Sequence, residues 1–122
     1  MWVEGAWHSG APNTPGLRKG PFLFVSGAVP IDLATGESVG TDIGEQTAQV
    51  IDNIEAVLKG AGCSFQDVVK VTVYMTDLAD FGKMNDVMAA RFGQHKPART
   101  TIQAARLPSG ATLEIDVVAR VP

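Results

Sequence analysis

The sequence is poor in cysteine, with Cys63 as the single thiol among 122 residues. One cysteine excludes an intramolecular disulfide and any zinc or iron–sulfur site that needs several thiolates. It is also typical of a reducing compartment, so we expect a cytoplasmic protein. Because Cys63 follows a predicted helix and has no histidine close to it in the sequence, we expect a packed side chain rather than a nucleophile.

Long apolar runs and runs of like charge are missing too. The longest apolar stretch, around Phe22 to Val25, is far too short to span a bilayer, and the chain does not open on a basic and then apolar signal segment. Ten basic and thirteen acidic residues are scattered, with no basic stripe that could follow a phosphate backbone. We therefore predict neither membrane nor nucleic-acid binding. His8 and His95 are isolated, so we also predict no metal site.

The composition that remains is that of a globular protein. With 45% hydrophobic and 19% charged residues, a chain of this length should bury roughly two-thirds of its unfolded surface. No segment after the first twenty residues has the composition of a linker. We expect residues 1–122 to form a single domain.

Hydrophobic periodicity predicts two helices. Asp42 stands three residues before Glu45, which is the spacing of a capping box, and the apolar residues that follow recur every three or four positions as far as Gly60. A second stripe of the same period follows Asp77 and ends near Gly93. Two amphipathic helices can cover one face of a sheet and leave the other face open.

Five segments have the β-branched, alternating or turn-bounded character of strands. The segment Gly10–Gly20 has no periodicity and is interpreted as an irregular arm, and Ala34–Glu37 is predicted to turn the chain into a hairpin return. The order of elements is strand, strand, helix, strand, helix, strand, strand, which indicates an α+β fold. The predicted strands are Trp2–Trp7, Phe22–Gly27, Val68–Thr76, Ala98–Leu107 and Ala111–Val121.

The alternation of side chains in the last two predicted strands indicates which face of the sheet each ionisable residue occupies. In the final strand Leu113 and its alternate neighbours form the core face, and Glu114 points to the opposite face. In the preceding strand Arg99, Thr101 and Gln103 share one face. If these strands pair as a hairpin, Arg99 and Glu114 can share the face that the helices leave open. That face then suits a subunit interface containing a polar pocket.

Arg99 and Glu114 are the candidate catalytic residues. The guanidinium of Arg99 offers a rigid fork of donors that matches a carboxylate, and Glu114 is a candidate acid, base or water-orienting group. The alternative is an ordinary cross-strand ion pair, which spacing alone favours. Ser26 and Gly27 offer either a hydroxyl and an approachable amide to a substrate or simply the start of a turn.

Several segments carry a family resemblance. PARTTIQAARLP at 97–108, followed by LEI at 113–115, resembles the C-terminal signature of the RidA/YjgF family of reactive-intermediate imine deaminases, formerly called the L-PSP endoribonuclease family. LFVSGAVPID at 23–32 and VVKVTVYMTDLADF at 68–81 resemble further landmarks of the family in the right order. The resemblance covers nearly the whole chain after Arg18.

The resemblance implies a chorismate-mutase-like fold, a mixed and mostly antiparallel sheet with two helices on one face, assembled as a homotrimer with clefts between subunits. It implies hydrolysis of 2-imino acids and their enamine tautomers to 2-oxo acids and ammonia, without cofactor or metal. Arg99 matches the arginine that grips the substrate carboxylate, and Glu114 the glutamate that orients or activates water. Ser26 and Gly27 match the pair that lines the cleft, and Pro108 a proline that shapes it.

The chain departs from the family pattern at the pocket. Thr101 stands where the family has a cysteine, and no tyrosine precedes the Ser26–Gly27 pair, because residues 11–19 read APNTPGLRK. The connection between Phe92 and Pro97 is also short. A trimer that binds small carboxylates or partner proteins without turnover is therefore the alternative function. An endoribonuclease is the third, and the net charge of −3 argues against it.

Overall fold

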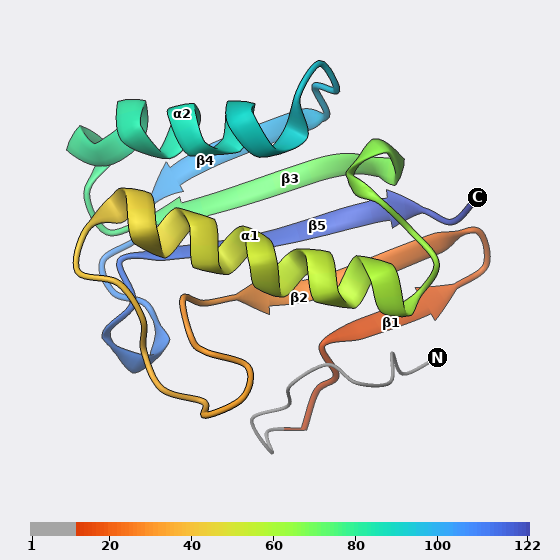
Figure 1. Cartoon of the computed structure of the whole chain (residues 1–122), viewed down its shortest axis with the longest axis horizontal. Helices are drawn as coiled ribbons and strands as arrows, with labels where there is room; N and C mark the ends of the chain where they lie inside the picture. The colour runs from red at the N-terminus through yellow and green to blue at the C-terminus, as the bar shows by residue number, and fades with distance from the viewer. Residues whose placement is uncertain (1–11) are drawn as a thin grey trace.

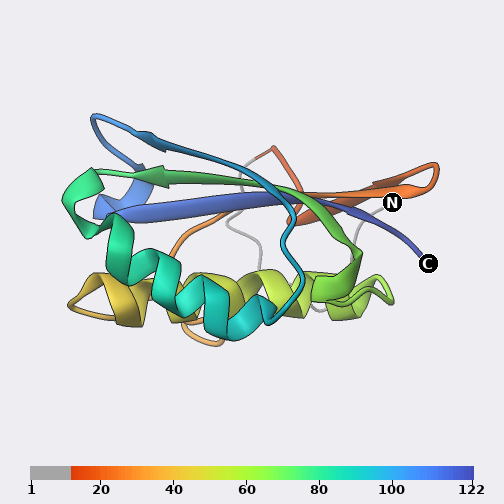
Figure 2. The same cartoon turned by 90° about the horizontal axis from the view of Figure 1, so that it is seen from above.

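The computed structural model describes residues 12–122, which build one mixed sheet with two helices across one of its faces (Figures 1 and 2). The sheet has five strands in the order β1-β2-β5-β3-β4, and every neighbouring pair is antiparallel except β3 and β4. This confirms the predicted sheet type and the helices on one face. The strands are β1 (Gly16–Lys19), β2 (Phe22–Ala28), β3 (Val68–Met75), β4 (Ala98–Gln103) and β5 (Leu113–Arg120); the helices are α1 (Ile43–Gly60) and α2 (Phe81–Phe92), with short 3-10 turns at Phe65–Asp67, Leu78–Asp80 and Pro108–Gly110.

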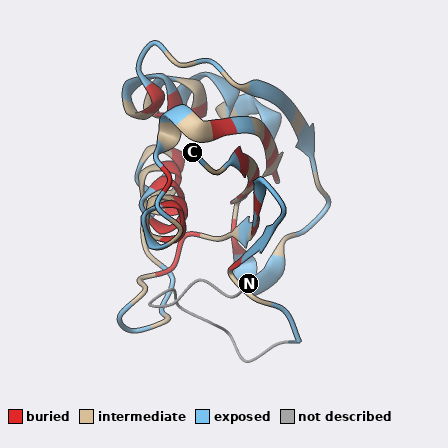
Figure 3. Ribbon diagram, turned by 90° about the vertical axis from the view of Figure 1, so that its right-hand side faces the viewer, coloured by how far each residue is buried: buried red, intermediate tan, exposed pale blue. Residues whose placement is uncertain are grey.

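The core lies between the sheet and the helices, where Figure 3 shows the buried residues gathered. The apolar stripe of α1 and the inward residues of the strands are nearly inaccessible to solvent, as alternation predicts. The fully buried side chains include Leu23, Ile51, Leu58, Val71, Met84 and Leu113.

Local signals in the sequence place both helices correctly. The Asp42 carboxylate accepts a hydrogen bond from the amide of Glu45 (2.9 Å), which is one half of the predicted capping box. The Glu45 carboxylate accepts a hydrogen bond from the Thr41 hydroxyl instead of from the backbone amide of Asp42. Asp77 caps the 3-10 turn that leads into α2, and Gly93 ends α2 with a positive φ of 64°.

The first strands differ from the expectation. The strand predicted at Trp2–Trp7 lies outside the described residues. The last part of the predicted irregular arm is in fact β1, which forms a hairpin with β2 through Gly20, whose φ is 58°. The hairpin return predicted after residues 34–37 is reduced to one bridge between Ile31 and Ser38. A short edge strand such as β1 has little pattern of its own, because its pairing comes from the longer neighbour.

The pairing predicted for the last two strands is wrong. β5 lies in the sheet between β2 and β3, and β4 pairs in parallel with β3 at the sheet edge. The physical reason is the contrast in composition: β5 alternates apolar residues that are buried, whereas the polar sequence ARTTIQ of β4 is mostly exposed. A polar strand is tolerated at an edge, and an apolar one belongs in the centre.

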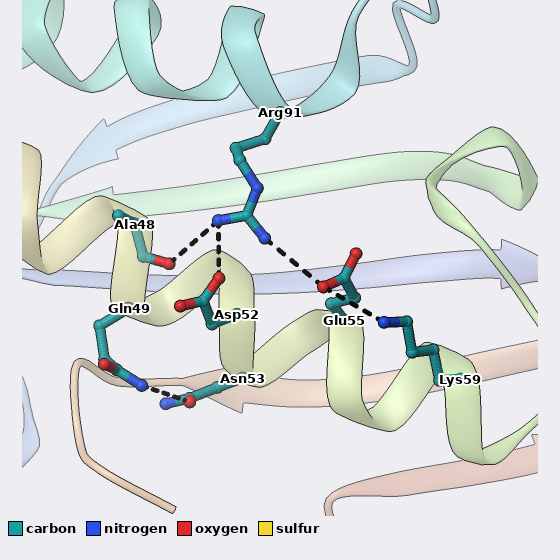
Figure 4. A network of polar contacts seen from close by, with 7 residues as sticks. All are labelled: Ala48, Gln49, Asp52, Asn53, Glu55, Lys59 and Arg91. Carbon is teal, nitrogen blue, oxygen red and sulfur yellow. Dashed lines mark hydrogen bonds and ion pairs between the residues drawn. The ribbon is translucent and has the colours of Figure 1, made fainter.

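Arg91 joins the two helices (Figure 4). Its guanidinium lies 2.7 Å from Asp52 and 3.6 Å from Glu55, both on α1, and 5.8 Å from the ring centre of Phe65.

We expect Arg91→Ala to lower the free energy of unfolding by about 1–2 kcal/mol, because apolar contact is lost with the charge. Urea unfolding at fixed protein concentration measures it. Lys59→Ala, at a side chain 73% exposed, should change stability by less than about 0.5 kcal/mol; equal effects would contradict the prediction.

Candidate functional site

A cavity of about 250 Å³ opens beside the end of β2. It brings together four residues that the sequence singled out, from three separate segments: Ser26 and Gly27 of β2, Pro108 of the last 3-10 turn and Glu114 of β5. The remaining wall comes from β2 and the loop after it, from α1, from the last 3-10 turn and from the segment before β1. Its lining residues are Asn13, Pro15, Val25, Ala28, Val29, Ile31, Leu33, Gly36, Asn53, Val57 and Ser109.

Gly27 and Glu114 fit against each other. The pairing of β2 with β5 slips between Val25 and Ala28, so Ser26 and Gly27 form a bulge rather than the turn considered from the sequence. A Cβ atom at Gly27 would lie 2.8 Å from the Glu114 carboxyl group, closer than carbon and oxygen atoms approach in proteins. The absence of a side chain at Gly27 therefore leaves the space that the Glu114 carboxylate occupies.

The surroundings of Glu114 favour its protonated form. The pKa of Glu114 is raised above its usual value, mainly because partial burial removes water from the carboxylate and also because Asp116 places a second negative charge nearby. Asp116 in turn accepts a hydrogen bond from the Tyr74 hydroxyl (3.1 Å), and Tyr74 is the direct β3 partner of Glu114. A carboxylate with a raised pKa is a better proton acceptor near neutral pH.

Ser26 lines the cavity but directs both of its donors away from a ligand. Its hydroxyl donates to the Thr14 carbonyl oxygen (2.6 Å), and its amide donates to that of Pro15 (2.9 Å). These bonds hold the segment before β1 against β2. The hydroxyl of Ser26 is thus a positioning group in this structure, and what it still offers to a ligand is the acceptor capacity of its oxygen.

Asn53 is a cavity residue that the sequence analysis missed. Its side-chain amide donates to the carbonyl oxygens of Val29 (3.0 Å) and Ile31 (2.8 Å), and its Oδ1 accepts from the Gln49 side chain (2.9 Å). Asn53 is 5% exposed and fixes the loop after β2 to α1. The signal available in the sequence was a polar residue inside the apolar stripe of that helix, directly before Ile54.

Arg99 lies on the other face of the sheet. Its Nη1 is 3.9 Å from the Met84 sulfur and 3.7 Å from the Met88 sulfur, and its Cζ is 5.5 Å from the ring centre of Phe81, so the side chain lies against α2. It borders a second cavity of about 400 Å³, to which Lys96 also contributes.

Arg99 and Glu114 therefore do not share a face, contrary to the expectation. Arg99 is level with buried Val71 on β3, whereas Glu114 is level with Tyr74 on the open side. The alternation within each strand was right, but the hairpin assumed between them put Arg99 on the wrong face. The alternative of a cross-strand ion pair within one copy fails for the same reason.

Thr101 lies on the same face of the sheet as Arg99. It is level with buried Val73, and its hydroxyl is buried without a hydrogen-bond partner, as is Oδ1 of Asn85 on α2. Native structures leave few buried polar atoms unpaired. Two buried polar atoms on the Arg99 side thus have no hydrogen-bond partner among the described residues.

Between residues 12 and 122, no three His, Cys, Asp or Glu side chains gather where they could hold a metal ion. In the same span, neither helix has the length and apolar character needed to cross a membrane.

Known proteins resemble this chain along nearly its whole length. The family model described as Endoribonuclease L-PSP matches residues 6–121. A RutC family protein of Pyrococcus abyssi is 50% identical over 119 residues, which cover 98% of this chain and 94% of that protein. RidA from the Antarctic bacterium Psychrobacter sp. superposes with a TM-score of 0.90 at 34% identity, over 95% of this chain and 94% of its own.

A relative in Escherichia coli adds information about function. TdcF, which bears the name "putative reactive intermediate deaminase", is 37% identical over 111 residues, 88% of this chain and 85% of its own. Its crystal structure with bound serine has a TM-score of 0.92 and covers 100% of this chain and 99% of that one. From these matches, the chain belongs to the RidA/YjgF/RutC family, the family of the Endoribonuclease L-PSP model.

Proposed function

We propose that the protein hydrolyses reactive 2-imino acids and their enamine tautomers to 2-oxo acids and ammonia. The observation that carries the proposal is Glu114, a carboxylate of raised pKa seated over Gly27 at the edge of a largely apolar cavity. The family membership and the name of TdcF support the same chemistry. Arg99 supplies the carboxylate-binding fork that a 2-imino acid requires.

The proposal includes assembly as a homotrimer with the sites at subunit contacts. Arg99 and Glu114 lie on opposite faces of one copy, so a single site needs Arg99 from one copy and Glu114 from the next. The sheet face that no helix covers also exposes large apolar side chains: Leu17 and Phe24, paired between β1 and β2, are 45% and 46% exposed, and Ile102 is 44% exposed. An apolar sheet face suits contact with further copies of the chain.

The reaction requires little from the protein beyond positioning of the substrate and one group that accepts a proton. Arg99 holds the substrate carboxylate and so orients the imine carbon. Water attacks the protonated imine carbon while Glu114 accepts a proton from that water. Glu114 then passes that proton to the amino group of the tetrahedral intermediate. As the carbon–nitrogen bond breaks and ammonia leaves, Glu114 accepts the proton of the hydroxyl group, which becomes the carbonyl group of the 2-oxo acid.

The direct test generates an imino acid with an amino-acid oxidase and follows its capture by semicarbazide. We expect added protein to lower semicarbazone formation in proportion to its concentration, because hydrolysis competes with capture. Unchanged capture at every protein concentration would contradict the proposal. Saturable binding of a 2-oxo acid in calorimetry without hydrolysis would favour the non-catalytic carboxylate-binding trimer.

Gly27→Ala tests the fit between the bulge and Glu114. The new Cβ would meet the carboxyl group at 2.8 Å, so the carboxylate must move. We expect hydrolysis to fall about tenfold to hundredfold, the usual effect of a displaced catalytic group. The matched control is Gly82→Ala on α2, where an added Cβ meets no atom within 4 Å. Full activity in Gly27→Ala would show that the position of Glu114 is unimportant.

Asp116→Asn tests the charge next to Glu114. Removing a negative charge makes ionisation of Glu114 easier and lowers its pKa. A base works only when ionised, so the pH below which kcat/KM declines should move to lower pH. The profile of kcat/KM against pH measures the shift, and an acid limb at the same pH in both proteins would contradict it. Asp86→Asn, at an exposed carboxylate of α2, should leave the profile unchanged.

A further inference from the structure

We propose that Tyr74 is a positioning residue for the hydrolysis: its hydroxyl group holds the Asp116 carboxylate in place beside Glu114, and through Asp116 it sets the pH range in which Glu114 accepts a proton. This inference rests on the proposed function and adds a residue to the same site. It depends on the register of the sheet, on one hydrogen bond and on the ionisable groups around Glu114.

The register of the sheet brings the three side chains together. Tyr74 on β3 lies directly opposite Glu114 on β5, and Asp116 follows two residues later on β5. Residues two positions apart in a strand point to the same face, and so do direct partners on neighbouring strands. Leu113 and Ile115, which alternate with the two carboxylates, are buried in the core. Tyr74, Glu114 and Asp116 therefore share the sheet face that no helix covers.

A hydrogen bond ties Tyr74 to Asp116 across the two strands. The Tyr74 hydroxyl donates to Oδ2 of Asp116 (3.1 Å), although the direct β3 partner of Asp116 is Thr72. The pKa of Tyr74 is raised above its usual value, first by this hydrogen bond and then by burial and by the negative charges of Asp116 and Glu114. The hydroxyl group therefore stays protonated and keeps donating throughout the pH range in which a glutamate titrates.

Asp116 is the group through which Tyr74 can act on Glu114. The described residues of β2, the loop after it, α1, the last 3-10 turn and the segment before β1 that line the cavity contribute no ionisable side chain. The ionisable groups that face Glu114 are thus Asp116 on its own strand and Tyr74 on β3. A carboxylate that is held in place keeps repelling the negative charge of Glu114, whereas one that turns toward water is screened.

Tyr74→Phe tests the inference, because it removes the hydroxyl group and keeps the ring that shields Glu114 from water. We expect the acid limb of the kcat/KM profile to move to lower pH, because a released Asp116 opposes the ionisation of Glu114 less. On that limb kcat/KM should exceed the wild-type value about twofold or more, whereas on the plateau at higher pH the two proteins should differ by less than about twofold. An acid limb at the same or higher pH, or a loss by the same factor at every pH, would overturn the inference.

Two further variants test whether the effect passes through Asp116. In the Asp116→Asn protein, Tyr74→Phe should cause no additional shift, because the charge that Tyr74 holds is already absent; shifts that add would overturn the inference. The matched control is Thr41→Val, because the Thr41 hydroxyl also donates to a carboxylate, that of Glu45 (3.4 Å), at an exposed place before α1. Thr41→Val should leave the profile unchanged, and a shift as large as that of Tyr74→Phe would also overturn the inference.

Failure of the proposed function is distinguishable from failure of this inference. If no imino acid is hydrolysed, the proposed function fails, and NMR of protein with isotope-labelled glutamate carboxyl groups still follows the titration of Glu114, whose signal is absent from Glu114→Gln. We expect Glu114 to titrate at lower pH in Tyr74→Phe than in the wild type. A midpoint at the same or higher pH in Tyr74→Phe would overturn the inference.

Discussion

Arg99→Met should lower kcat/KM for imine hydrolysis by at least about hundredfold while the protein stays folded. Methionine is unbranched and apolar, so it can pack against α2 beside Met84 and Met88, whose sulfur atoms the Arg99 guanidinium contacts. It cannot form the two parallel hydrogen bonds that a guanidinium makes to a carboxylate. The semicarbazide competition measures the loss.

Two companion variants test whether hydrolysis needs the planar guanidinium of Arg99 or only its positive charge, and whether removal of an unrelated cation also lowers activity. Arg99→Lys keeps the positive charge but not the planar fork, so we expect an intermediate loss, mainly in KM. Lys59→Ala removes an exposed cation on α1 and should leave hydrolysis unchanged. Wild-type activity in Arg99→Met would show that the substrate carboxylate is held elsewhere.

Glu114→Gln should have the other large effect, a loss of about 10²- to 10⁴-fold in kcat, which is the range for a general acid or base. Glutamine has the same shape, so the space over Gly27 stays filled, but an amide cannot accept the proton of the attacking water. Substrate binding should change little, because Arg99 holds the carboxylate. Steady-state kinetics on the purified variant separate kcat from KM.

Two further variants serve as controls for Glu114→Gln: one shortens the side chain that carries the carboxylate, and the other removes a carboxylate elsewhere in the chain. Glu114→Asp keeps a proton acceptor at a shorter reach, so we expect part of the activity to remain. Glu37→Gln changes an exposed glutamate in the loop after β2 and should have no effect on kcat. If Glu114→Gln and wild type have the same kcat, another group activates water.

The helices and the strand faces were predictable because their signals are local. Capping by Asp42, the end of α2 at Gly93 and the alternation around Leu113 each depend on residues a few positions apart. The order of the strands is not local. The pairing of β3 with β4 and with β5 joins segments tens of residues apart, and the 3-10 turn Pro108–Gly110 between β4 and β5 does not join these two strands as a hairpin.

The candidate site was predictable in its residues but not in its geometry. Alternation correctly grouped Arg99 with Thr101 and assigned Leu113 rather than Glu114 to the core face, yet in the polar strand β4 it does not say which face meets the helices. That choice follows from the whole sheet order, which put Arg99 beside α2. Asn53 escaped notice because its partners, two loop carbonyl groups, are more than twenty residues away.

The decisive measurement is the activity of mixed assemblies formed by co-expressing Arg99→Met and Glu114→Gln under separate affinity tags. If each site takes Arg99 from one copy and Glu114 from another, random mixing in equal amounts restores both groups at about one quarter of the sites. We expect about a quarter of wild-type activity in the mixture, although each variant alone is nearly inactive. Activity no higher than that of the separate variants would contradict a site shared between copies.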